Sequence, residues 1–152
     1  MSGRVIDIDV FATTLAELGY AGQQTGKVAE FPNGLLLTTP LKNTSLTGEY
    51  VLHLFRMPIP QEALHDLDQV EAVAMSAADM ATQAWQAEAE AHFRKISVES
   101  FIAFPSGRNK VLWDFSDPDQ LTLVVRVACP SDMRLKVEQA VFRDTWRALR
   151  PR

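Results

Sequence analysis

Apolar and polar residues alternate with period two in several short runs of the chain, and turn-forming residues separate these runs. A period of two is typical of a β-strand, because successive side chains of a strand point to opposite faces. The run at 49–58 is apolar on both faces, which predicts a central strand or one covered on both sides. The other predicted strands are 94–104, 110–115 and 121–129, with a β-hairpin over 26–40 that turns at Pro-Asn-Gly 32–34.

The segment 5–18 permits two interpretations. "RVIDIDVF" alternates as a strand does. The following "FATTLAELGY" places Thr14 and Glu17 at the spacing of a capping box, with Gly19 as a C-terminal stop. Strand and helix therefore compete in this segment, and we favour a helix over residues 11–18.

Residues 61–93 contain nothing that breaks a helix, and Pro60 suits a first helical turn. An unbroken helix of this length would extend about 50 Å, well beyond the roughly 30 Å of a small domain, so it either protrudes or breaks. Ser76 and Asp79 form a capping-box-like pattern and mark the predicted break. One apolar stripe at helical spacing is expected to pack on a sheet: Leu64, Leu67, Val70, Ala74, Ala77, Ala81, Ala84 and Trp85.

A last amphipathic helix is predicted to begin near Ser131 or Asp132 and to stop at Pro151. The chain shows no internal repeat and no linker. We therefore predict a single α+β domain over residues 1–152. In it, an antiparallel sheet is covered by the long helix, whole or broken, and by the C-terminal helix.

Composition narrows the class of protein. The chain has 152 residues, of which 47% are hydrophobic and 22% charged, as in folded proteins. A net charge of −4 argues against nucleic acid as the main partner. No apolar run approaches the length of a membrane span, and Asp7 and Asp9 interrupt any signal core. We expect a cytoplasmic protein without membrane association, and the single Cys129 excludes an internal disulfide.

Each candidate for a catalytic, phosphate-binding or metal site lacks a residue or spacing that such a site requires. "GYAGQQTGK" at 19–27 lacks the first glycine of a phosphate loop and the hydroxyl residue after its lysine. Cys129 has no base or electropositive setting in its motif, and a buried structural role fits it better. His53, His65 and His92 are too scattered for a metal site. We therefore predict no catalytic residue, no metal and no cofactor.

Charge is segregated along the chain. Residues 60–93 contain seven acidic residues and no Lys or Arg, whereas residues 132–152 contain six basic and three acidic residues. The two segments would attract each other within a monomer if both helices lie on one face of the sheet. The alternative is a polar surface that orients a protein partner.

The order hairpin, strand, long helix, three strands and C-terminal helix resembles the PsbP-like/DcrB-like α/β/α sandwich family. The closing "FRDTWRALRP" at 142–151 is similar to that family's last helix, and the layout covers residues 25–152. The resemblance implies a non-enzymatic binding role. Proteins with this fold include effector-associated chaperones of bacterial type VI secretion. It implies no catalytic residue.

These observations lead to the hypothesis of a bacterial, non-enzymatic protein-binding domain. It would act as a dedicated chaperone, an adaptor or an immunity-type inhibitor, linked to bacterial secretion. Trp85, Trp113 and Phe115 are the predicted partner-binding residues, although all three can equally be core. The alternative is a small-molecule-binding protein or enzyme with a pocket between the sheet and helix 61–93, lined by His53 or Cys129. A third interpretation is a homodimer.

Overall fold

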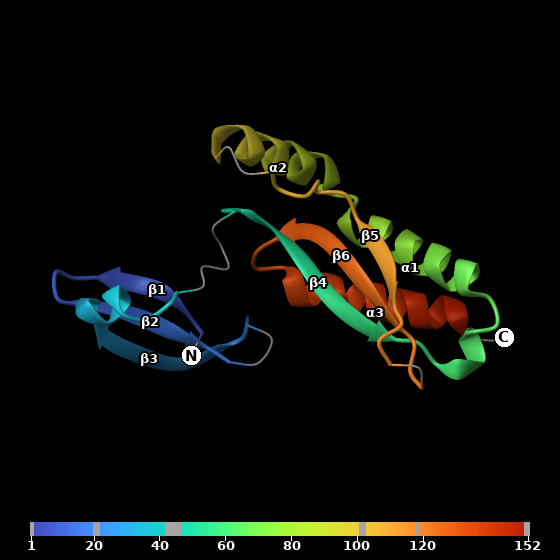
Figure 1. The fold of residues 1–152 in the computed structure, drawn as a ribbon, viewed down its shortest axis with the longest axis horizontal. Coiled ribbons are helices and arrows are strands. Elements are labelled where there is room, and N and C mark those ends of the chain that lie inside the picture. The colour runs from blue at the N-terminus through green and yellow to red at the C-terminus, as the bar shows by residue number, and fades with distance from the viewer. Residues whose placement is uncertain (1, 20–21, 42–46, 101–102, 118, 151–152) are drawn as a thin grey trace. The chain divides into compact units, whose positions relative to one another are not determined.

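The computed structural model describes residues 2–19, 22–41, 47–100, 103–117 and 119–150. The chain divides into two compact units, Met1–Thr44 and Ser45–Arg152, which we call unit 1 and unit 2 and describe separately. Unit 1 is a sheet with one short helical turn, and unit 2 combines a sheet with α-helices (Figure 1). Antiparallel sheets with packed helices confirm the predicted α+β class. That residues 1–152 form one folding domain stays a prediction.

Unit 1 contains sheet A, three antiparallel strands in the order β1-β2-β3. The strands are β1 (Gly3–Ile8), β2 (Ala12–Leu18) and β3 (Gln24–Pro32), followed by the 3₁₀-helix η2 (Asn33–Leu37). β1 confirms the strand interpretation of the first segment. The predicted helix over 11–18 is wrong, because β2 bonds to a strand on each side and so satisfies its backbone groups in a sheet. The β-branched Thr13 and Thr14 suit that environment.

The predicted hairpin over 26–40 is also wrong. Only its first half is a strand, and Pro-Asn-Gly leads into η2 instead of turning back. A two-residue hairpin turn of this sequence requires positive φ at both central residues, and Gly34 does not have a positive φ. Asn33 instead bonds to the connection between β1 and β2. The sequence also predicts a polar loop at 41–48, and most of this segment falls outside the described residues.

Unit 2 contains sheet B, with antiparallel strands in the order β4-β6-β5. They are β4 (Tyr50–Pro58), β5 (Lys110–Asp114) and β6 (Thr122–Pro130), which confirms three of the predicted strands. The central strand is β6, so of the two predictions for strand 49–58 the central position is wrong, whereas coverage on both sides holds for its first residues. β4 is apolar on both faces because its first residues are covered on both sides.

Three α-helices of the described residues belong to unit 2. They are α1 (Leu67–Thr82), α2 (Gln86–Ser100) and α3 (Arg134–Leu149), and the short η3 (Gln61–Ala63) precedes α1. The predicted long helix is indeed broken, but between Thr82 and Gln86 and not at Ser76. At this break the Trp85 indole donates to the Ala128 carbonyl of β6 at 3.0 Å.

The strand predicted at 94–104 is also wrong, because packing on sheet B decides the structure of this segment. α2 continues to Ser100, although Ile96 and Val98 favour strands. Ala89 and Phe93, four residues apart on α2, are buried with Tyr50 and Ala128 of sheet B. This contact requires helical spacing, so tertiary packing overrides the local pattern.

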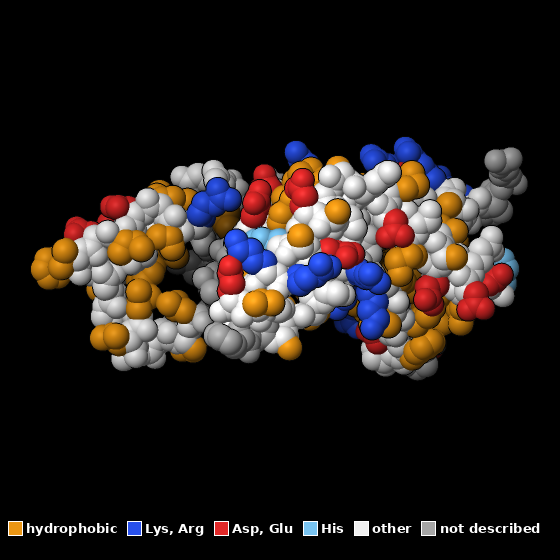
Figure 2. Space-filling model, turned by 90° about the horizontal axis from the view of Figure 1, so that it is seen from above, with side chains coloured by type: hydrophobic (Ala, Val, Ile, Leu, Met, Phe, Trp, Pro, Cys, Tyr) orange, Lys and Arg blue, Asp and Glu red, His pale blue; other side chains and the backbone are white. Residues whose placement is uncertain are grey.

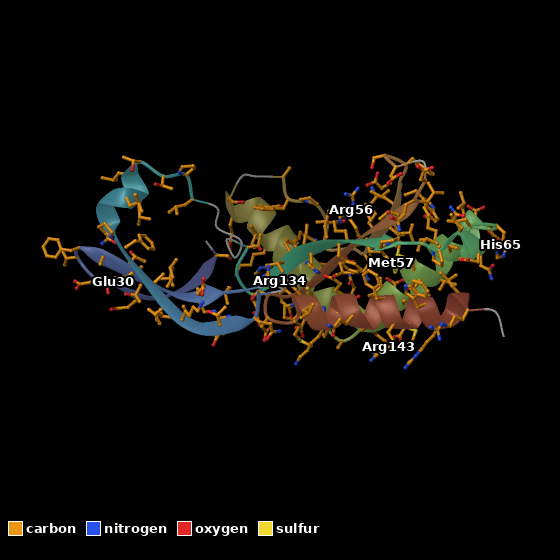
Figure 3. The ribbon with its side chains drawn as sticks, turned by 90° about the horizontal axis from the view of Figure 1, so that it is seen from below. Glu30, Arg56, Met57, His65, Arg134 and Arg143 are labelled. Carbon is orange, nitrogen blue, oxygen red and sulfur yellow. The ribbon has the colours of Figure 1, made fainter. Side chains whose placement is uncertain are left out.

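The core of unit 2 lies between sheet B and the pair α1 and α3. Met57 points into this layer, whereas Arg143 points outward from α3 (Figure 3). The apolar stripe of α1 is confirmed for Val70, Ala74 and Ala77, which are buried in the core, but Ala84 is exposed. α2 packs on the other face of the sheet, at the Tyr50 end of β4. Sheet B is therefore covered fully on one face and partly on the other.

The segregated charges of α1 and α3 do not meet as ion pairs in the described part of the chain. The two helices pack side by side, but Arg143 and Arg147 pair with Asp144 of their own helix. The attraction between these segments therefore acts only through the weak long-range field of solvated charges.

We expect Gly107→Ala to lower the free energy of unfolding by about 1–3 kcal/mol, the cost of overpacking. A Cβ at Gly107 would lie 3.1 Å from both Cα and N of Glu90, and these backbone atoms of α2 cannot move alone. Urea denaturation followed by tryptophan fluorescence measures the change. The matched control is Ser106→Ala, an exposed neighbour expected to change stability by less than about 0.5 kcal/mol. Equal stability of the two variants would contradict the close approach of this loop to α2.

Candidate functional site

One arrangement in unit 2 resembles a nucleophile with its base. His53 and Cys129 lie on the face of sheet B that carries the helices, at diagonal positions of paired strands. The Nε2 atom of His53 lies 2.8 Å from Oε2 of Glu138 on α3. Cys129, however, is fully buried, and no hydrogen bond between described residues joins it to His53. The geometry lacks the contact that would activate the thiol.

The electrostatic setting of Cys129 also opposes catalysis. Burial raises the pKa of its thiol to about 11, with a smaller upward effect from Asp132 and an opposing effect from Arg134. A catalytic cysteine needs a lowered pKa so that the reactive thiolate forms near neutral pH. Cys129 is therefore a structural residue of the core.

The histidines do not gather into a metal site. His53 contacts Glu138, the Nδ1 atom of His65 lies 3.0 Å from the Glu62 carbonyl, and His92 contacts the Thr47 carbonyl. Among the residues the structure describes, no three His, Cys, Asp or Glu side chains converge as metal ligands would. Unit 2 thus offers no centre for metal chemistry within this part of the chain.

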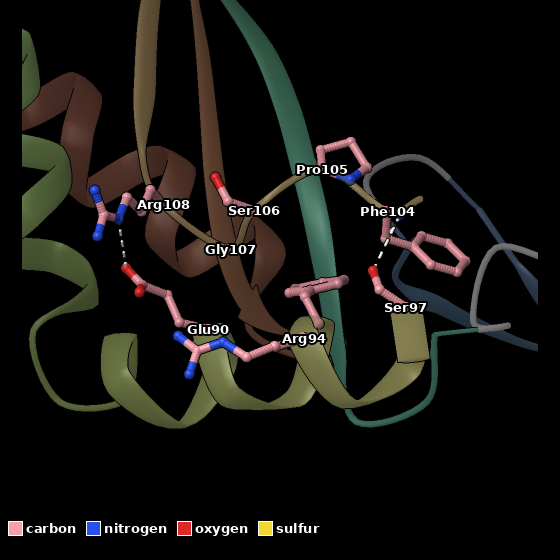
Figure 4. Close-up of a pocket in the computed structure, with 9 residues that line it drawn as sticks. Glu90, Arg94, Ser97, Phe104, Pro105, Ser106, Gly107 and Arg108 are labelled. Carbon is pink, nitrogen blue, oxygen red and sulfur yellow. Dashed lines mark hydrogen bonds and ion pairs between the residues drawn. The ribbon is translucent and has the colours of Figure 1, made fainter. Parts of the chain in front are cut away.

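A groove of about 390 Å³ lies between α2 and the loop before β5 (Figure 4). Arg108 Nε lies 3.5 Å from Oε1 of Glu90, and Ser97 accepts a hydrogen bond from the Phe104 amide. Arg94 supplies a second guanidinium to the lining. The groove is not the pocket predicted between the sheet and helix 61–93, because neither His53 nor Cys129 lines it.

The contact between α2 and sheet B includes one polar tie. The Tyr50 hydroxyl donates to Oε2 of Glu88 at 2.8 Å. This hydrogen bond, then burial and the charges of Glu88 and Glu49, raise the pKa of Tyr50 to about 12. The tie fixes α2 over the first residues of β4 and leaves the rest of that sheet face uncovered.

The uncovered part of sheet B forms a mixed apolar and basic surface, which we call the open face. Register and alternation place two cross-strand rows on it, opposite the buried Phe55, Val111 and Val125. Leu54 is 59% exposed and Leu112 50% exposed. Asp114, next to these rows, forms an ion pair with Arg56. The residues of the open face are Leu54, Arg56, Lys110, Leu112, Val124 and Arg126.

Sheet A has one largely apolar face and one mixed face. Residues paired across antiparallel strands share a face, so the register assigns each side chain. One face, which we call the apolar face of unit 1, carries Val5, Ile8, Thr13, Leu15, Ala29 and Phe31. The opposite face carries Arg4, Asp7, Thr14, Ala16, Val28 and Glu30.

The apolar face of unit 1 is half-covered over Leu15 and Phe31 but open at the edge strand β1, where Val5 and Ile8 are exposed. Thr13 is the one buried residue among the described residues of this unit. Nine of the fifteen exposed large apolar residues in the described chain lie in unit 1, which has less than a third of the length. Figure 2 shows apolar side chains spread over its surface. Surfaces of this kind mark interaction sites.

The three predicted contact residues have different environments. Trp85 packs against both buried clusters, and its indole is hydrogen-bonded to β6. Trp113 is partly buried against the core, and Phe115 is exposed and stacks on Trp113 with ring centroids 6.3 Å apart. Phe115 thus remains accessible to a partner, whereas Trp85 serves the core. The sequence hypothesis missed the apolar face of unit 1, because a bulge between Val5 and Asp7 brings Val5 and Ile8 to one face, whereas strict alternation would separate them.

Comparisons with known proteins add no identity to this geometry. No family model matches the sequence, and no curated protein matches it. The helices within the described residues are all too short or too polar to cross a membrane.

We expect the Cys129 thiol of the native protein to react with iodoacetamide at pH 8 at least about a hundredfold more slowly than in the unfolded chain. A rise in pKa from 9.0 to about 11 lowers the thiolate fraction by that factor, and burial slows access further. Mass spectrometry of alkylated protein measures the rate, with urea-unfolded protein as the reference and Cys129→Ser as the blank. Rapid alkylation of native protein would contradict the buried, protonated thiol.

For Tyr50, we expect Glu88→Gln to lower the pKa from about 12 toward the ordinary value near 10, because the charged acceptor is lost. Tyrosinate absorbance against pH measures it in a Tyr20→Phe background, which leaves Tyr50 as the one tyrosine. Since the folded pKa is raised, this tie contributes stability below about pH 10 and loses it as the pH rises through about 12. An unchanged midpoint in Glu88→Gln would show that the hydrogen bond does not form.

Proposed function

We propose that the chain is a non-enzymatic protein-binding protein of the dedicated-chaperone, adaptor or immunity-inhibitor type. The observation that carries this proposal is the exposed β1 edge of the apolar face of unit 1, with Val5 and Ile8 open to solvent. A sheet with one apolar face needs a second layer against that face. The described residues of unit 1 supply only η2 as such a layer.

The size of unit 1 strengthens the argument. Unit 1 lies close to the length of about 40 residues, below which disulfides, a metal or association are usually needed for stability. Its described residues contain no metal cluster, and the chain's single cysteine lies in unit 2. Exposed Val5 and Ile8 would therefore gain most from a protein surface that completes the layer.

The chemistry of unit 2 supports a binding role over catalysis. Its cysteine is buried with a raised pKa, and its histidines have separate partners. The resemblance to the PsbP-like/DcrB-like family implies the same kind of role. We propose with it a bacterial protein linked to secretion, and the interrupted apolar N-terminus supports a cytoplasmic location. Phe115 is a secondary contact in this proposal.

One observation favours the alternative of a small-molecule-binding protein. The groove beside α2 has a volume within the range of ligand sites, and Arg94, Arg108 and Ser97 suit an anionic ligand. The Glu90 carboxylate next to Arg108 offsets much of that positive charge. The groove therefore supports this function less strongly than the apolar face supports protein binding.

We expect a single protein to co-purify stoichiometrically with the tagged full chain from its native host at low salt, and Ile8→Asp to abolish this complex. Ile8 is 70% exposed on the apolar face, so its replacement leaves the core intact but places a charge in the interface. Circular dichroism of each variant checks the fold.

The matched control is Val28→Asp, because Val28 is 61% exposed on the opposite face of the same sheet. It should retain the complex. If no protein is recovered and a metabolite anion raises the melting temperature instead, the small-molecule alternative replaces this proposal. Equal loss of the complex in both variants would show that the apolar face is not the binding surface.

A further inference from the structure

The connection between β1 and β2 displays two large apolar side chains to solvent. Val10 is 79% exposed and Phe11 81% exposed, among the highest values of any apolar residue described. Turns of this kind ordinarily carry polar residues or glycine. We call residues 9–12, with these two side chains, the tip of unit 1.

Asn33 holds the tip in one conformation. Its Nδ2 donates to the carbonyls of Asp9 at 2.7 Å and Val10 at 3.1 Å, and its backbone amide donates to the Phe11 carbonyl at 2.8 Å. Its Oδ1 accepts from the Thr13 hydroxyl at 2.6 Å. Three of these hydrogen bonds reach the tip itself and leave its backbone little freedom. A surface ordered in advance loses less entropy when it binds.

The tip is also acidic. Asp9 belongs to it, and Asp7 and Glu30 lie in one cross-strand row just behind it, on either side of Thr14. The nearest basic residues on the three strands, Arg4 and Lys27, lie farther along the sheet. An occupant that covers Phe11 must therefore be apolar at its centre and basic around it.

The open face of sheet B has this chemistry. Its rows are Leu54–Arg126–Lys110 and Arg56–Val124–Leu112, so it carries three apolar and three basic side chains. With Asp114 beside Arg56, the surface carries a net positive charge opposite in sign to the tip. Both surfaces occur in every copy of the chain, at equal concentration.

We infer that two copies of this chain form a reciprocal dimer, in which the tip of each copy packs on the open face of the other. One tip alone buries too little area, since stable interfaces need about 1,000 Å² or more. A two-fold arrangement uses the same contact twice and closes the assembly. This dimer leaves the apolar face of unit 1 unused, so it stands independently of the proposed protein-binding function.

Light scattering of the purified full chain at low salt tests the dimer directly. We expect a dimer whose dissociation constant rises at least about tenfold in Phe11→Ser and in Leu54→Ser, because each removes an apolar anchor. Added salt should weaken the wild-type dimer, because acidic and basic side chains face each other. Val98→Ser, which removes a similarly exposed apolar side chain from α2, should leave the dimer unchanged.

Cysteine trapping identifies which surfaces meet. A Phe11→Cys chain mixed with a tagged Leu54→Cys chain should form a disulfide-linked heterodimer, and a mixture with Val98→Cys should not. Cys129 stays in place because it is buried. A monomer at high protein concentration overturns the inference, as does equal trapping at Val98. A disulfide within a single Phe11→Cys/Leu54→Cys chain also overturns it, because the tip would then meet its own copy.

The same variants separate this inference from the proposed function. One outcome would contradict the dimer and leave the protein-binding proposal in place. In it the wild type is a monomer, and a captured protein partner is lost in Ile8→Asp but kept in Phe11→Ser. A dimeric wild type from which no protein partner is captured would support the dimer and contradict the protein-binding proposal. Assemblies that grow beyond two copies with concentration would contradict the closed, reciprocal arrangement.

Discussion

Trp85 is the residue on which the layered structure of unit 2 depends. It lies between α1 and α2, its indole donates to the Ala128 carbonyl of the central strand, and its ring packs against the buried clusters on both faces of sheet B. Because the two helices lie on opposite faces, this one side chain fixes where the chain passes around the end of the sheet. A continuous helix over 61–93 would leave Phe93 and Tyr50 without the partners that bury them.

Unit 1 is held together mainly by hydrogen bonds, whereas unit 2 is held together by a hydrophobic core. Thr13 is its one buried described residue, and Asn33 joins its tip to the start of η2. Hydrogen bonds of this kind specify a conformation but contribute only about 1 kcal/mol each to stability, since water competes for the same groups. These hydrogen bonds thus define the conformation of sheet A, and under the proposed function a further surface would add to its stability. This difference between the units is the physical reason for placing the binding role in unit 1.

The sequence predicted the elements whose local pattern agrees with their tertiary environment. Alternation identified β4, β5 and β6, and helical spacing identified the buried Val70, Ala74 and Ala77 of α1. The errors at 32–34 and 94–104 share a cause, because each segment is decided by a partner far along the chain, whereas 11–18 is a strand because it pairs with β1 and β3 on either side of it. Asn33 bonds to residues more than twenty positions away, and Phe93 packs on a strand that precedes it by about forty. No period in a short window contains these contacts.

The candidate site was harder to predict than the fold, because residue type does not determine exposure. Large aromatic side chains were the natural choice for a partner surface, yet Trp85 and Trp113 contribute to the core and only Phe115 lies open. The informative signal was instead a conflict at one place, where "DVFA" sets Val10 and Phe11 in a turn that polar residues would normally occupy. Local rules tend to fail at functional positions. Asn33 is part of the same mismatch between sequence and structure. Its sequence context predicts a hairpin turn, but its side chain bonds to the turn that exposes Val10 and Phe11 to solvent.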